Sequence, residues 1–122
     1  EDPRFSAAPA GWKRDSAYRL PFQGAESLAD AGARVAAHLR AWGRAAPEAT
    51  LKLMVGHGGA FRHAASALGA LAPERVSQLS MDYCAPIYFE CRLASSGSAQ
   101  LVQVGGSWRP RSSGSAASRA LD

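Results

Sequence analysis

The clearest hydrophobic pattern of the chain lies in its first half. Between residues 28 and 43, hydrophobic side chains recur every three or four positions: Leu28, Ala31, Val35, Leu39 and Trp42. This spacing places them on one face of a helix. Ser27 followed by Asp30 is a capping-box pattern, and Pro47 follows Gly43 at the other end. The sequence therefore predicts a helix over about 28–43.

The second half of the chain mixes short extended and helical patterns. The apolar run 51–56, LKLMVG, is typical of a strand buried on both faces of a parallel sheet. A helical pattern over 60–71 follows it, and a short helix over 73–80 begins with proline. Segments 86–93 and 99–104 have strand composition and are joined by ASSGS, which predicts a hairpin.

This set of elements supplies one strand of the parallel type and one hairpin. A parallel strand needs neighbours on both sides, so 51–56 must lie at an edge or beside strands that this sequence does not contain. The chain opens with Glu1 rather than Met, and we expect that something precedes it in the natural protein. An unpaired strand edge also leaves open a homo-oligomer.

Composition narrows the class of protein. A chain of 122 residues that is 47% hydrophobic and 20% charged is typical of one soluble globular domain. No apolar run approaches the ~20 residues that span a bilayer, and no signal peptide opens the chain. The net charge is +4, but Lys and Arg are scattered, which argues against a nucleic-acid partner. We expect residues 107–122, rich in Ser, Arg and Gly, to be a disordered tail.

The two cysteines indicate a reducing compartment. Cys84 and Cys91 lie in what is predicted as one extended segment, which separates their Cα atoms by roughly 23 Å. A disulfide needs Cα atoms within ~7 Å, so we expect free thiols and a cytoplasmic protein. No metal-ligand spacing and no cofactor motif occurs in the sequence.

His57 is the candidate for chemistry, because it lies where the apolar run 51–56 ends and a helix begins. Ligands of open α/β sheets bind outside the carboxyl ends of the strands, and a helix N-terminus favours anions. The glycines beside His57 remove side chains, so that the backbone can approach a ligand closely. From the residues alone two interpretations stay open: an anion pocket with one titratable member, or a tight turn whose histidine caps local carbonyls.

Two segments then point to a family. The segment LMVGHGGAFRHAASALG (53–69) resembles the second-histidine motif of the histidine phosphatase superfamily, also called phosphoglycerate mutase-like, and LPFQGAESLADAGARVAAHL (20–39) is similar to its Gly-Glu-Ser segment. The order of elements matches throughout 20–104. The resemblance implies the C-terminal part of a three-layer α/β/α fold over 1–106, with a mostly parallel sheet, a C-terminal hairpin and the N-terminal half absent.

The resemblance also implies a reaction on a small phosphorylated substrate. In the family, a histidine of an Arg-His-Gly motif attacks phosphorus, and a second histidine, matched by His57, donates hydrogen bonds to the transferring group. Gly58, Gly59 and Arg62 would then bind phosphate, while Glu26 and Ser27 support the structure. The expected function is phosphoryl transfer or phosphate monoester hydrolysis, with no cofactor and no metal.

The sequence contains no Arg-His-Gly motif, so the attacking histidine is expected outside this chain. The pair Arg62–His63 is rejected for that role, because it lies within a predicted helix and lacks the glycine. Arg62 either pairs with Glu26 or helps to hold the anion, and we expect His38 and His63 to be surface histidines. The alternative to an enzyme is a degenerate member that binds a phosphorylated ligand or a protein without turnover. Phosphatase and mutase outcomes remain open.

Overall fold

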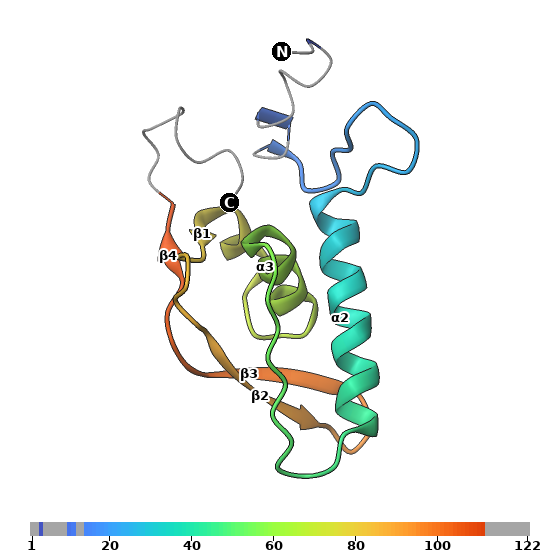
Figure 1. Ribbon diagram of the computed structural model, residues 1–122, viewed down its shortest axis with the longest axis vertical. Helices are drawn as coiled ribbons and strands as arrows, with labels where there is room; N and C mark the ends of the chain where they lie inside the picture. The colour runs from blue at the N-terminus through green and yellow to red at the C-terminus, as the bar shows by residue number, and fades with distance from the viewer. Residues whose placement is uncertain (1–2, 4–9, 12–13, 112–122) are drawn as a thin grey trace.

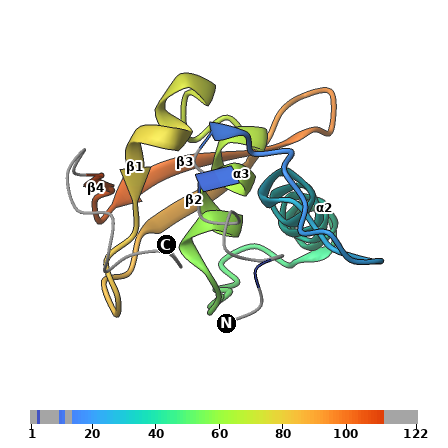
Figure 2. The same ribbon diagram turned by 90° about the horizontal axis from the view of Figure 1, so that it is seen from above.

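Two helices that run in the same direction form the centre of the fold, since Leu28 contacts Gly59 near their starts and Arg40 donates to the Ala67 carbonyl near the end of the second. The computed structural model describes residues 3, 10–11 and 14–111. In it, α2 (Leu28–Ala45) lies beside α3 (Gly58–Ala67), as the two views of Figures 1 and 2 show. The hairpin of β2 (Tyr88–Leu93) and β3 (Ala99–Gly105) packs against α2. The short 3-10 helix η2 (Pro73–Gln78) connects α3 to β1 (Leu79–Ser80).

The predicted capping box starts α2. The Ser27 hydroxyl accepts a hydrogen bond from the Asp30 backbone N–H at 3.0 Å, and the Asp30 carboxylate accepts one from the Ser27 N–H at 2.9 Å. Arg19 forms an ion pair with the same carboxylate at 2.7 Å. The helix then continues to Ala45, two residues beyond the predicted end. The prediction of this helix is confirmed.

The two helices approach each other closely at Gly32, which is buried on α2. A Cβ atom added there would lie 2.2 Å from His63 Cβ and 3.0 Å from the His63 carbonyl carbon. Next to this contact, Ala36, Ala64 and Leu68 form the buried core with Leu101 of β3. Small side chains at the interface therefore allow α3 to pack closely on α2.

Helix α3 ends earlier than predicted because Gly69 adopts a left-handed conformation with φ +79°. The Gly69 N–H donates to the Ser66 carbonyl at 3.1 Å, and the Ala70 N–H donates to the Ala65 carbonyl at 2.8 Å. These two bonds form a Schellman motif, the usual way to end a helix at glycine. The predicted helix over 60–71 is thus correct in type, but it begins at Gly58 and ends at Ala67.

The expectation of a mostly parallel sheet is wrong. β2 pairs with β3 in an antiparallel hairpin, as predicted, and β1 pairs antiparallel with β4 (Arg109–Pro110). Segment 51–56 runs extended beside α3 (Figure 1) but forms no ladder with the strands of the described residues. Its outer side chains Leu51, Leu53 and Val55 are 91%, 83% and 92% exposed. A parallel strand needs a parallel neighbour, and none lies within the described residues.

The start of the expected tail is ordered. Arg109 and Pro110 form β4, opposite Ser80 and Leu79. The Trp108 ring lies 6.3 Å from the Phe89 ring, centroid to centroid, and its indole N–H donates to the Gln103 side chain at 3.0 Å. This part departs from the expected disorder because its aromatic side chain contacts the hairpin. Residues 112–122 of the expected tail lie outside the described residues.

Two further findings concern the described residues alone. Cys84 and Cys91 are free thiols, as predicted. None of the described helices combines the length and the apolar character that crossing a membrane requires.

The first prediction concerns acid stability. The pKa of Asp30 is lowered to about 2, first by hydrogen bonds from Ser27 and then by Arg19. A lowered carboxyl pKa contributes stability that is present above the ordinary value of 3.8 and is lost as the pH falls toward about 2. Asp30→Asn should therefore lower stability at neutral pH and flatten the pH dependence below 4. Urea unfolding at several pH values measures this; an unchanged slope would contradict it. Glu48→Gln, at an exposed position, is the matched control.

The second prediction concerns the helix contact. Gly32→Ala should destabilise the protein by about 1–3 kcal/mol, because the new methyl group overlaps the Cβ atom of His63. Helix propensity alone predicts the opposite, a gain of about 1 kcal/mol. Ala37→Gly, exposed on the same helix, calibrates that propensity. A Gly32→Ala variant that unfolds at higher urea concentration than the parent would refute the close contact.

Candidate functional site

His57 lies at the N-cap of α3, where the extended segment 51–56 ends (Figure 1). Its backbone is extended, with φ −94° and ψ 137°, and its side chain is exposed and does not cap the helix. Within the part of the chain that the structure describes, the imidazole makes no hydrogen bond. The interpretation of His57 as a histidine that caps local carbonyls is therefore wrong. The ring is free to meet a ligand at the positive end of α3.

Close packing also explains the glycines that follow His57. A Cβ atom at Gly58 would lie 3.4 Å from Met81 Cβ, and one at Gly59 would lie 2.9 Å from a Leu28 methyl group. The absence of side chains thus lets the first turn of α3 fit between the start of α2 and the residue after β1. Their role in phosphate binding remains a prediction, and their N–H groups are in the first turn where such binding occurs.

Arg62 lies one turn into α3 and is 1% exposed. Its guanidinium donates a hydrogen bond to the Leu79 carbonyl of β1. The pairing of Arg62 with Glu26 is not found, because Glu26 forms an ion pair with Arg34 at 2.8 Å. The hydrogen bond from Arg34 is the main cause that lowers the pKa of Glu26. Arg62 therefore connects α3 to β1 in the interior, and phosphate binding by it remains a prediction.

His63 is not the surface residue that the sequence predicted. It is half-buried against α2, and its Nδ1 lies 2.8 Å from the Gly59 carbonyl oxygen. Because a carbonyl only accepts, Nδ1 carries the proton and Nε2 is the acceptor of the neutral ring. Burial is the main cause that lowers the pKa of His63, and the charge of Arg62 also lowers it. In the sequence, this bond was indicated only by the position of His63 four residues after Gly59, which is one turn of a helix. His38, by contrast, is exposed as expected.

The residues after β1 lie beside the first turn of α3, since Met81 contacts the Gly58 position. Asp82 forms an ion pair with Arg109 at 2.6 Å. Tyr83 and Cys84 are exposed. In residues 14–111, no three His, Cys, Asp or Glu side chains cluster as a metal site would require. Among the residues the sequence named, the structure brings Gly58, Gly59 and Arg62 together with His57 on α3. Glu26 and Ser27 lie at the start of α2.

Comparison with known proteins adds a family. Residues 2–101 match the family model described as the histidine phosphatase superfamily (branch 1). Comparisons with curated proteins and with solved structures find no match.

The third prediction compares the buried Arg62 with the exposed Arg34 in their contribution to stability. Arg62→Ala should lower the free energy of unfolding by at least about 2 kcal/mol, because a buried charge-assisted hydrogen bond and the packed aliphatic stem are lost. Arg34→Ala, which removes an exposed ion pair, is the matched control and should change stability far less. Urea unfolding of both variants compares them. Equal, small losses would show that Arg62 does not hold β1 on α3.

Proposed function

Because this chain belongs to the histidine phosphatase superfamily, we propose that it takes part in phosphoryl transfer or phosphate monoester hydrolysis through a phosphohistidine intermediate. His57 is the assisting histidine, which donates hydrogen bonds to the transferring phosphoryl group. The attacking histidine belongs to an Arg-His-Gly motif, which residues 1–122 do not contain. It therefore lies outside this chain, and the substrate is a small phosphorylated molecule.

The observation that carries the proposal is the exposed ring of His57 at the uncapped N-terminus of α3. A phosphoryl group in transfer spreads negative charge over its equatorial oxygens. The first-turn N–H groups of Gly58 and Gly59 and the helix dipole are fixed donors for that charge, and the exposed imidazole adds a further donor beside them. Such donors need no rearrangement during the reaction, which is why they lower its barrier.

Arg62 makes a structural contact that its sequence position did not indicate. Its guanidinium is buried and donates to the Leu79 carbonyl. It therefore connects α3 to β1, and the binding of phosphate by Arg62 stays a prediction. Two residues support the site from a greater distance. Ser27 caps α2, and Glu26 forms an ion pair with Arg34.

The exposed segment 51–56 supports the location of the attacking histidine. Its outward side chains Leu51, Leu53 and Val55 are apolar, and it leads directly to His57. A neighbouring parallel strand would end at the same edge, because carboxyl ends of parallel strands meet there. A histidine after that strand would thus reach the phosphoryl group that His57 holds.

A second function is favoured by one observation. The only Arg-His pair in the sequence, Arg62–His63, lies inside α3, with Arg62 buried and the His63 ring bonded to Gly59. A protein without another nucleophile would bind a phosphorylated ligand without turning it over. The natural full-length polypeptide, incubated at micromolar concentration with p-nitrophenyl phosphate, distinguishes the two. Turnover with an acid-labile phosphoprotein supports the enzyme; neither at any pH from 5 to 9 supports the binding protein.

The fourth prediction concerns His57. If the full-length protein is active, His57→Ala should lower kcat by at least ~10²-fold, the cost of removing one donor aimed at developing charge. His38→Ala is the matched control, because His38 is exposed on α2, and it should leave kcat unchanged. Steady-state kinetics at one pH measure both. An active His57→Ala variant within threefold of the parent would contradict the assignment.

A further inference from the structure

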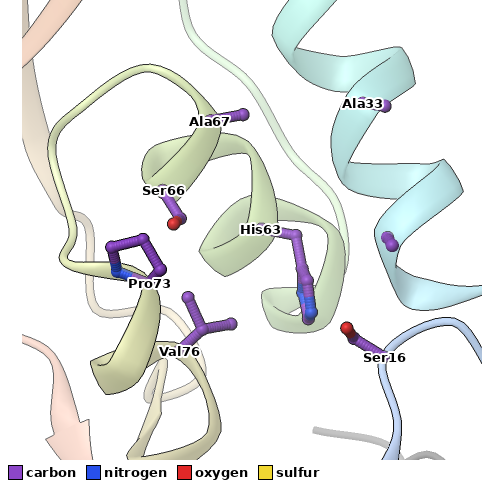
Figure 3. Close-up of a pocket in the computed structure, with 8 residues that line it drawn as sticks. Ser16, Ala33, His63, Ser66, Ala67, Pro73 and Val76 are labelled. Atoms are coloured by element: carbon purple, nitrogen blue, oxygen red, sulfur yellow. The ribbon is translucent and has the colours of Figure 1, made fainter.

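A hollow of about 330 Å³ lies between α2, α3 and η2 (Figure 3). Most of its wall is apolar: Ala29 and Ala33 from α2, Ala67 from α3, and Pro73 and Val76 from η2. Among the described residues, its polar groups are the side chains of Ser16, His63 and Ser66. Neither His57 nor another residue of the predicted phosphate site lines it. The hollow therefore has no part in the proposed function.

The acceptor in this hollow is Nε2 of His63. The opposite nitrogen, Nδ1, is held by the Gly59 carbonyl at 2.8 Å, which fixes both the ring and its tautomer. In Figure 3 the ring points from α3 toward Ser16 at the wall of the hollow. Within the described residues, Nε2 has no hydrogen-bond partner. A fixed acceptor on an apolar wall selects a ligand that brings one donor.

The charge of the lining residues limits the class of ligand further. None of the described residues that line the hollow is a carboxylate, a lysine or an arginine, so an ion would find no counter-charge among them. Burial, more than the opposing hydrogen bond to Gly59, lowers the pKa of His63, and the charge of Arg62 lowers it too, which favours the neutral ring. The alanine side chains leave a shallow wall against which a flat ring can pack with little loss of conformational entropy.

We propose that this hollow binds a small, uncharged aromatic molecule with one hydroxyl or ring N–H donor, which bonds to Nε2 of His63. The aromatic ring lies against Ala29 and Ala33 of α2, opposite Pro73 and Val76. The hydroxyls of Ser16 and Ser66 offer further polar contacts at the wall. The site is separate from the phosphate site, so that each can fail without the other.

The test uses phenol and fluorobenzene, which have similar size and differ in the donor. In ¹H–¹⁵N spectra of the full-length protein at pH 7.5, phenol should produce saturable shifts at the amides of Ala29, Ala33, His63 and Val76. Fluorobenzene should bind about 3- to 10-fold more weakly, which is the usual value of one hydrogen bond. Phosphatase activity is measured in parallel and is not expected to report on this site.

Three variants locate the effect. His63→Leu should abolish the preference for phenol while fluorobenzene still binds, and His38→Leu, on the exposed face of α2, should preserve that preference. Ala33→Phe, at an exposed position that lines the hollow, should fill it and remove binding of both probes. Absence of saturation by phenol at 50 mM, equal affinity for the two probes, or unchanged binding in Ala33→Phe would each overturn the proposal. If His63→Leu does not fold, the probe comparison and Ala33→Phe still decide.

Discussion

The close contact of α2 with α3 at Gly32 is the constraint on which the rest of the described structure depends. The missing side chain lets the His63 backbone approach α2, and the small residues Ala36 and Ala64 continue the interface. The same packing brings Leu28 against Gly59, so the start of α3 is fixed relative to the capped start of α2. The N-terminus of α3, and with it His57, therefore has a defined position.

The carboxylates around the start of α3 are paired with arginines, which favours an anion at this position. The carboxylates of Glu26, Asp30 and Asp82 each form an ion pair with an arginine: Arg34, Arg19 and Arg109. Paired carboxylates repel a nearby phosphate less than free ones. Arg62 is buried at β1, and His63 is bonded to Gly59, so both contribute to holding α3. The exposed imidazole that remains on this helix is that of His57.

The sequence predicted those features that depend on local contacts. The helix at Leu28–Ala45, its capping box and the β2–β3 hairpin follow from spacing, caps and turn residues. The sheet direction was wrong, because strand pairing depends on segments far apart in the chain, and β1 pairs with β4. The burial of Arg62 and His63 was missed for the same reason, since it comes from packing on β1 and α2. His57 was found because its position between an apolar run and a helix is a local pattern.

In the proposed site, the His57 ring and the first turn of α3 together bind a phosphate group. Titration of inorganic phosphate into the ¹⁵N-labelled full-length protein tests it directly, with the His57 ring nitrogens and the Gly58 and Gly59 amides as probes. We expect saturable shifts at all three residues, and none at the exposed ring of His38 on α2. Shifts that stay linear to 50 mM phosphate, or that are equal at His57 and His38, would contradict it.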